Sequence, residues 1–150
     1  MSTDMSGMIE CRPGARIWGE GDEDAVWMAA IDLFLLNTGN AYDALACLFG
    51  VRNSFGFQPL VEDRGLPEDI SDGVRAAFTA YGGPEYAHST TWITGAELTA
   101  ANWDETDSSG AHSRCSVAGD ATHWGPVWEV MRTLSGLHGP ENLRLVVWFD

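Results

Sequence analysis

Residues that can hold an anion fall close together in one irregular part of the chain. Arg52, Asn53 and Arg64 lie between residues 51 and 70, a long stretch with Gly and Pro that is typical of an ordered functional loop. A guanidinium group can hold a phosphate through two hydrogen bonds, or it can tie such a loop to carboxylates. Four carboxylates lie near Arg64 in the sequence: Glu62, Asp63, Glu68 and Asp69. Both roles of the arginines therefore stay open.

His88 and Ser89 are suited to proton transfer or to polar contact with a ligand. An imidazole can act as a general acid or base and a hydroxyl as a nucleophile, or the pair can supply hydrogen bonds. Both residues begin a segment, 88–92, that is expected to be extended. A histidine satisfied by the neighbouring backbone is an equally good interpretation, so neither residue is predicted to be catalytic.

Seven tryptophans and six phenylalanines are many for 150 residues. An aromatic face can stack on a nucleic-acid base, which contributes about 1–3 kcal/mol per base. Trp128, Trp148 and Phe149 fall on apolar faces and are predicted to lie in the core. Trp92 and Trp103 flank a helix candidate beside polar residues, so they are the better candidates to line a pocket.

Sequence signatures of familiar enzymes and cofactor sites are absent. There is no phosphate-binding loop of the Walker type, no GxSxG, no HExxH and no GxGxxG. His112, Cys115 and His123 have side chains that zinc accepts, but a structural zinc site needs a second tight pair of ligands. We therefore predict no metal and no cofactor.

Charge excludes several classes of partner. The chain carries 22 acidic and eight basic residues, all of the latter Arg, for a net charge of -14. Duplex nucleic acid and membrane surfaces need clustered positive charge, so neither is expected as a partner. No signal-like or membrane-spanning apolar run occurs, and the three cysteines form no CxxC pair, which indicates reduced thiols in the cytoplasm.

Apolar patterning predicts one α+β domain over residues 1–150, with a small antiparallel or mixed sheet packed against three to four helices. Residues 8–11 and 15–18 are expected to form a hairpin around Pro13-Gly14, and further strands are expected at 88–92 and 143–149. Residues 31–36 suit either a buried strand or part of a helix. Cys47 falls in the apolar run 44–49 and is predicted to be buried.

Four helices follow from capping residues and apolar spacing. They span residues 41–49, capped by Asn40 and ended by Gly50; 71–81, capped by Ser71; 94–103, with a capping box from Thr94 and Glu97; and 124–137. Residues 104–121 are polar and rich in Gly and Ser, so we expect a mobile surface loop or a poorly packed insertion there.

A series of short motifs occurs in order from residue 40 to 150: Asn40-Ala41-Tyr42-Asp43, Val51-Arg52-Asn53, Arg64-Gly65-Leu66-Pro67-Glu68-Asp69-Ile70-Ser71, His88-Ser89-x-x-Trp92-Ile93-Thr94, Glu97-Leu98 and Val147-Trp148-Phe149-Asp150. Together they resemble a family of small uncharacterised proteins of phage and bacterial genomes. Relative to that family, residues 104–121 look like an insertion. The resemblance implies, by association, a counter-defence role in the bacterial cytoplasm.

One way to disarm bacterial immunity is to sequester the nucleotide signal that activates it. The resemblance therefore suggests a sponge for a cyclic ADP-ribose-like molecule or a cyclic oligonucleotide, a type of protein that often forms a homo-oligomer. Arg52 and Arg64 would contact phosphates. The remaining expected contacts are with the base, the ribose and other polar groups of the ligand: Tyr42, Trp92, Trp103, Asn53, His88 and Ser89.

Two other functions remain open. A hydrolase would use His88 as acid or base, with Asp69 or Asp150 as its partner or as a metal ligand. An acidic interaction protein would instead dock on a basic host factor. Capture of a ligand is favoured over cleavage, because the sequence offers arginines and aromatic rings but no recognisable acid–base pair. The ligand-binding hypothesis requires that the 51–70 loop and the 88–92 segment line one shared cavity.

Overall fold

A four-stranded antiparallel sheet forms the centre of the computed structural model, which describes residues 2–14, 26–36 and 38–150. Its strands are β1 (Met5–Cys11), β2 (Met28–Asp32), β3 (His88–Thr94) and β4 (Leu143–Phe149). Their order across the sheet is β2-β1-β4-β3, so the last strand in the chain lies between the first and the third. The predicted α+β class is confirmed, and the sheet is antiparallel rather than mixed.

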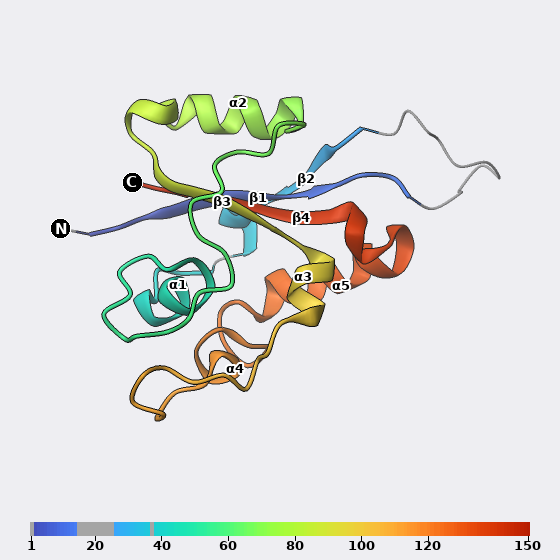
Figure 1. Cartoon of the computed structure of the whole chain (residues 1–150). Coiled ribbons are helices and arrows are strands. Elements are labelled where there is room, and N and C mark those ends of the chain that lie inside the picture. Colours follow the sequence, from blue (N-terminus) through green and yellow to red (C-terminus); the bar gives the residue numbers. More distant parts are fainter. Residues whose placement is uncertain (1, 15–25, 37) are drawn as a thin grey trace.

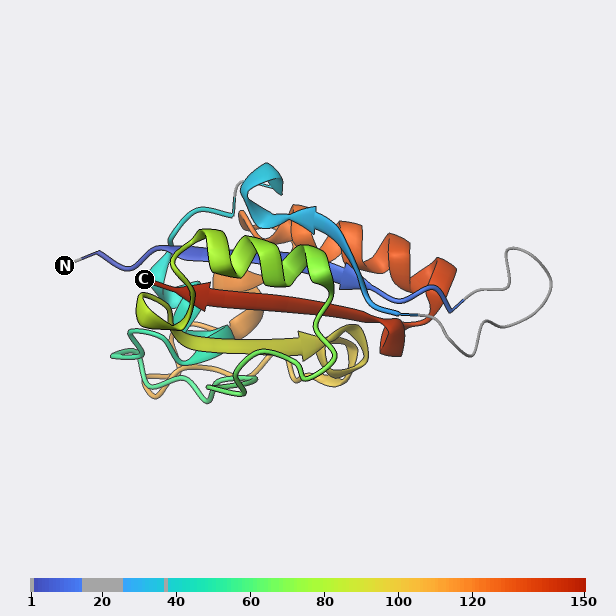
Figure 2. The same cartoon turned by 90° about the horizontal axis from the view of Figure 1, so that it is seen from above.

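Helices cover both faces of this sheet (Figures 1 and 2). One face carries α2 (Asp72–Ala80). The opposite face carries α1 (Tyr42–Phe49), α3 (Gly95–Ala100), α4 (Arg114–Ala118) and α5 (Gly125–His138). Three short 3-10 turns complete the described elements: η1 (Leu33–Leu36), η2 (Gly83–Glu85) and η3 (Pro140–Asn142).

The central strand β4 explains why the sheet needs two covering layers. All seven of its residues are buried, and successive side chains point to opposite faces. Leu145, Val147 and Phe149 join the larger core with α1 and α5. Val146 and Trp148 pack against Ile70, Val74 and Phe78 in a smaller core under α2. The predicted burial of Cys47, Trp128, Trp148 and Phe149 is confirmed.

Local capping signals fix most helix ends. Ser71 accepts a hydrogen bond from the Val74 amide at 3.2 Å, and Gly50 ends α1 in the left-handed conformation with φ 72°. Thr94 and Glu97 form the predicted capping box. The role predicted for Asn40 is wrong, because the N-cap of α1 is Ala41 without a side-chain bond. The Asn40 amide instead donates to Asp4 at 2.6 Å.

The N-terminal strands differ in part from the prediction. Residues 8–11 belong to β1 as expected, but residues 15–18 lie outside the described residues. The described neighbour of β1 on that side is β2. The ambiguous segment 31–36 divides at Asp32, whose carboxylate accepts a hydrogen bond from the Phe34 amide at 2.9 Å and turns the chain into η1.

Residues 104–121 are packed more closely than expected. We predicted a mobile surface loop or a poorly packed insertion, yet the segment contains α4, which packs against α1. Arg114 is only 2% exposed and donates to the carbonyl oxygens of Cys47, Gln58 and Asn102. A buried guanidinium needs acceptors for its N–H groups, and this anchoring role of Arg114 was not visible in the polar composition of the segment. The expectation of poor packing is therefore wrong for its second half.

Two smaller findings complete the fold. The helix expected to end near Trp103 ends at Ala100. None of the helices in the described residues combines the length and the apolar character needed to cross a bilayer.

Candidate functional site

A cavity of about 640 Å³ opens on the α2 face of the sheet, beside the residues that lead into α2. It is lined by residues from β3, β4, the long connection before α2 and the segments flanking β1 and β2: Arg12, Trp27, Arg64, Leu66, Pro67, Glu68, Asp69, Trp92, Thr94 and Arg144. Three of the eight basic residues of an acidic chain thus meet at one cavity. We call it the arginine–tryptophan cavity.

Guanidinium groups and indole rings alternate along this cavity. The Arg12 and Arg144 guanidiniums lie 4.8 Å and 3.9 Å from the centre of the Trp27 ring. Arg144 and Arg64 lie 5.9 Å and 4.9 Å from the Trp92 ring. Each contact of this kind contributes about 0.5–1 kcal/mol when exposed and about 2 when desolvated. The rings therefore help to hold three positive charges close together.

Arg144 forms the floor of the cavity. Its side chain is only 4% exposed, and its Nε donates to Glu10 Oε1 at 2.5 Å. Its Nη1 and Nη2 donate to the Asp69 carboxylate at 2.7 Å and the Asp69 carbonyl at 3.2 Å. The second oxygen of Glu10 accepts from the Ser71 amide at 2.8 Å. These hydrogen bonds hold the N-terminal end of α2 against the sheet.

Strand register explains the Glu10–Arg144 pair. Glu10 on β1 lies opposite Arg144 on β4, and Arg144 lies opposite Thr94 on β3. All three residues therefore occupy the same face and level of the sheet. A buried charge is tolerated only when it is paired and hydrogen-bonded, which both residues achieve.

Arg64 closes one side of the cavity. Its Nη1 donates to the Trp92 carbonyl at 3.2 Å and to Glu97 Oε1 at 2.9 Å, and its Nη2 donates to Glu97 Oε2 at 2.6 Å. The hydrogen bonds from Arg64 are the main reason why the pKa of Glu97 is lowered from 4.5 to about 2. The partner of Arg64 is thus Glu97 and none of the four carboxylates near it in the sequence.

Arg12 and Asp69 add one further positive and one negative charge to the lining of the cavity. Arg12 donates through Nε to the Asn142 side chain at 2.8 Å, and no carboxylate of the described residues lies within 4.0 Å of its guanidinium. Asp69 is 62% exposed in its side chain and also accepts from Trp27 Nε1 at 3.0 Å. Burial by itself would raise the pKa of Asp69, but the hydrogen bond and charge of Arg144 outweigh it and lower that pKa.

Of the residues predicted to bind a ligand, Arg64 and Trp92 meet in this cavity. Arg52 and Tyr42 meet elsewhere, with the guanidinium 4.7 Å from the phenol ring and Nε donating to Thr3 at 2.7 Å. Asn53 holds its own loop together, because its side chain exchanges two hydrogen bonds with the backbone of Phe57. Neither Arg52 nor Asn53 lines the cavity.

His88 and Ser89 lie at the opposite end of β3 from Thr94, which lines the cavity. Six residue steps along a strand span about 20 Å, so the two ends are well separated. His88 Nδ1 lies 3.0 Å from Ser89 Oγ, and Ser89 adopts a positive φ of 54° where the pairing with β4 is irregular. The 88–92 segment therefore reaches the cavity through Trp92 alone.

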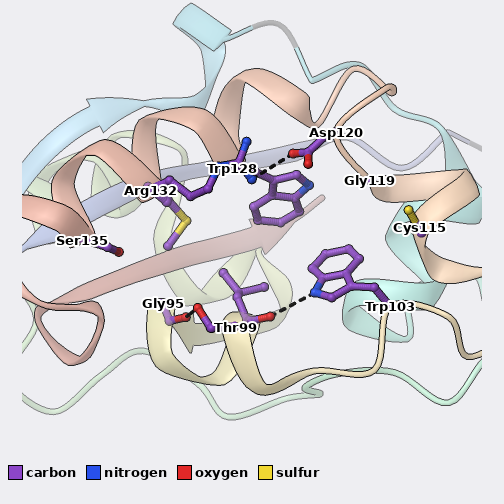
Figure 3. Close-up of a pocket in the computed structure, with 11 residues that line it drawn as sticks. Gly95, Thr99, Trp103, Cys115, Gly119, Asp120, Trp128, Arg132 and Ser135 are labelled. Carbon is purple, nitrogen blue, oxygen red and sulfur yellow. Dashed lines mark hydrogen bonds and ion pairs between the residues drawn. The ribbon is translucent and has the colours of Figure 1, made fainter.

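Trp103 lines a second cavity, of about 390 Å³, between α3 and the α4–α5 region (Figure 3). Its indole donates to the Leu98 carbonyl at 3.0 Å, and the Trp128 indole donates to the Ala118 carbonyl at 2.6 Å. The two rings meet edge to face at 5.6 Å. The cavity's only guanidinium, from Arg132, is bound to Asp120 at 2.9 Å. These walls suit an apolar group better than a phosphate.

Metal-type residues do not converge in the described part of the chain. No group of three or more His, Cys, Asp or Glu residues there has the arrangement of a metal site. His112 Nδ1 lies 3.1 Å from Asp107, and Cys115 lines the second cavity.

Four residues that build the arginine–tryptophan cavity were not predicted from the sequence: Glu10, Arg12, Trp27 and Arg144. A signal existed for Arg144, which interrupts an otherwise apolar strand, and for Glu10, which falls in another strand segment. Charged residues inside buried strands are rare unless they are paired, so their coincidence could have suggested an ion pair.

Comparisons with known proteins add no identification to this geometry. No family model matches the chain, and neither the curated proteins nor the solved structures contain a significant match. The functional inference therefore depends on the chemistry of the cavity.

Proposed function

We propose that the chain is a binding protein that captures a nucleotide-derived ligand in the arginine–tryptophan cavity. The observation that carries this proposal is the convergence of three guanidiniums and two indoles on one cavity of about 640 Å³. That volume falls within the range of small-molecule sites, roughly 300–1,000 Å³. It is also the larger and the more cationic of the two cavities described above.

Arg12 and Arg64 are the phosphate-binding groups of this proposal. Arg12 has no ion pair with a described carboxylate. Arg64 is paired with Glu97, but its side chain is 32% exposed, so it can also contact a phosphate in the cavity. Arg144 is buried and bound to two carboxylates, so it positions the site rather than the ligand. Asp69 and Glu68 can accept hydrogen bonds from ribose hydroxyls or base amino groups. A nucleotide carries both kinds of group.

Capture is favoured over hydrolysis by the composition of the cavity. The described residues that line it include no histidine, cysteine or serine. A general base works best with a pKa near the operating pH, whereas the pKa of Asp69 is lowered. His88, the acid or base of the alternative hydrolase, lies at the far end of β3. His88 therefore cannot serve as the proton-transfer partner of Asp69 in the cavity.

The motif resemblance supports a more specific role. A phage-type counter-defence protein would use this cavity to sequester an immune signal, such as a cyclic ADP-ribose-like molecule or a cyclic oligonucleotide, in the bacterial cytoplasm. Sequestration needs tight binding and an unaltered ligand, which is what a cavity with anchored arginines and no catalytic pair favours.

Calorimetric titration with ADP-ribose, cyclic ADP-ribose and a cyclic dinucleotide tests the proposal. We expect stoichiometric binding of at least one of them, and chromatography after denaturation should recover that ligand unchanged. Arg12→Gln and Arg64→Gln should each weaken binding about tenfold or more, since each removes a charge-assisted hydrogen bond. Arg132→Gln, which alters an exposed arginine of the second cavity, is the matched control.

Three results would count against the proposal in different ways. Recovery of cleaved products would favour the hydrolase. Absence of binding and of any thermal stabilisation with all three probes would remove the nucleotide class. Equal affinity in the Arg12 and Arg132 variants would place the ligand outside this cavity.

A further inference from the structure

The second cavity has the size and the lining of a small-molecule site in its own right. Its volume of about 390 Å³ lies within the usual range of such sites, roughly 300–1,000 Å³. Buried apolar side chains form its inner wall, namely Leu98 of α3 and Trp128 and Met131 of α5. The half-buried Trp103 completes this wall from the segment after α3. The proposed nucleotide site uses none of these residues.

The rings of this wall are held in place by the protein itself. Both indole N–H groups are bound to backbone carbonyls, of Leu98 for Trp103 and of Ala118 for Trp128. Trp124 stacks on Trp128, with ring centres 5.3 Å apart and planes inclined by 24°. A site whose side chains are already ordered loses little conformational entropy when a ligand binds. The inner wall therefore favours a flat aromatic ring, which needs no hydrogen bond there.

The rim of the cavity carries one cation and one anion (Figure 3). The side chains of Arg132 and Asp120 are 62% and 69% exposed, and Arg132 Nη1 donates to Asp120 Oδ1 at 2.9 Å. Arg132 follows Trp128 by one turn of α5, so the pair lies next to the indole wall. The bond uses one N–H group and one oxygen, which leaves further donors on Arg132 and the Oδ2 atom of Asp120 for a ligand.

A neutral amide fits this pair better than a charged group does. The carbonyl of an amide can accept from Arg132 while its N–H donates to Asp120, and the ion pair stays intact. A carboxylate would gain Arg132 but would meet the negative charge of Asp120. An ammonium would gain Asp120 but would meet the positive charge of Arg132. Either charged group therefore meets a like charge at the rim, and the amide does not.

We propose that the second cavity binds a flat aromatic molecule that carries an uncharged amide. Its ring lies against Trp103 and Trp128, and its amide bridges Arg132 and Asp120. This inference is independent of the proposed function, because the second cavity shares no lining residue with the arginine–tryptophan cavity.

Three naphthalene compounds of similar size and different charge test the proposal by calorimetric titration. They are 2-naphthamide, 2-naphthoate and 2-naphthylmethylammonium. We expect the amide to bind one to one and about fivefold or more tighter than either charged compound, since each of these loses one of the two hydrogen bonds. Equal affinity for all three, or tighter binding of a charged one, would overturn the assignment of an amide. Absence of binding by all three would overturn the site.

The exposed thiol of Cys115 reports whether the ligand lies in this cavity, which it lines. Bound 2-naphthamide should slow the modification of Cys115 by iodoacetamide, measured by mass spectrometry. Thr99→Phe should remove this protection and weaken binding about tenfold or more, because Thr99 is an exposed lining residue from which a ring can fill the cavity. Ala100→Phe is the matched control, since Ala100 is exposed on the same helix and does not line the cavity.

Removal of one rim group tests the amide contact separately. Arg132→Met keeps an apolar stem but removes the donors, so it should weaken the binding of 2-naphthamide about fivefold. Its exposed pair contributes little to stability, so the variant should fold. Arg75→Met, at an exposed arginine of α2 on the other face of the sheet, should leave the affinity unchanged. Equal affinity in the two arginine variants, or in the two phenylalanine variants, would overturn the proposal.

Discussion

Arg144 has its charge enclosed by the carboxylates of Glu10 and Asp69 and by the ring of Trp27. Such a residue is costly to bury and still more costly to leave without its partner. Removing one member of a buried pair typically destabilises a protein by about 3–5 kcal/mol, because the other charge stays uncompensated. The pair is therefore a sensitive point in a domain whose total stability is of order 5–15 kcal/mol.

We expect Glu10→Gln to lower the free energy of unfolding by about 3–5 kcal/mol, measured by urea denaturation. Asp120→Asn, in the exposed Arg132–Asp120 pair, should cost less than about 1 kcal/mol. The double variant Glu10→Leu/Arg144→Leu should lose less than Glu10→Leu and Arg144→Leu added together, because it leaves no buried charge alone; Asp69, which also loses its partner, is 62% exposed in its side chain and stays solvated. Equal losses from Glu10→Gln and Asp120→Asn would show that the buried pair does not support the fold.

Sequence reasoning named Arg64 and Trp92, which line the arginine–tryptophan cavity, but not their neighbours there, and the reason is distance along the chain. Arg64 and Trp92 stand out locally, in a loop and beside a helix cap. The partner of Arg144 lies 134 positions away, and its identity follows only from strand register. His88 and Ser89 were grouped with Trp92 by proximity in sequence, although an extended strand carries its two ends far apart.

Elements whose ends are set by local chemistry were predicted well. Ser71, Gly50 and the Thr94–Glu97 capping box each act within a few residues, so the sequence contains the whole interaction. The failure at Asn40 arises because a tertiary partner, Asp4, competes for its amide. Helix α4 was missed because it is short and polar and is held by Arg114 reaching carbonyls of distant segments.

The first turn of α3 gives a prediction for low pH. Glu97 belongs both to the capping box and to the pair with Arg64, and its pKa falls from 4.5 to about 2 on folding. Its folded pKa is depressed, so its contribution to stability is complete above pH 4.5 and is lost as pH falls toward 2. Glu97→Gln should therefore show a flatter decline of melting temperature across that window than the unaltered chain.

Glu85→Gln provides the control for this pH dependence, since Glu85 is an exposed carboxylate in the short turn η2. Its curve should follow that of the unaltered chain. Identical slopes for the Glu97 and Glu85 variants would mean that the bond between α3 and the 51–70 connection contributes nothing to acid stability.

At the scale of the whole molecule, the accessibility of the three cysteine thiols shows how well the folded protein shields its interior from solvent. Cys115 is exposed, whereas Cys11 and Cys47 are buried. Burial raises the pKa of Cys11 and raises that of Cys47 to about 12, so neither forms the reactive thiolate readily. Iodoacetamide should therefore modify Cys115 in the native protein, and Cys11 and Cys47 only after denaturant is added. Mass spectrometry of the labelled peptides measures this order.

A Cys115→Ser variant should remain unmodified under native conditions. Rapid modification of Cys47 in the native protein, at a rate close to that of Cys115, would contradict the packing of α1 against the sheet.

The position of β4 between β1 and β3 has a consequence for biosynthesis. A ribosome releases this strand after every other strand of the sheet, so β1 and β3 have no common neighbour until residues 143–149 emerge. Up to that moment the nascent polypeptide carries apolar segments that cannot yet be covered. Its surplus of carboxylates keeps neighbouring nascent chains apart, and a stop codon before residue 143 would leave the β1–β2 pair and a β3 without its described partner rather than a shortened domain.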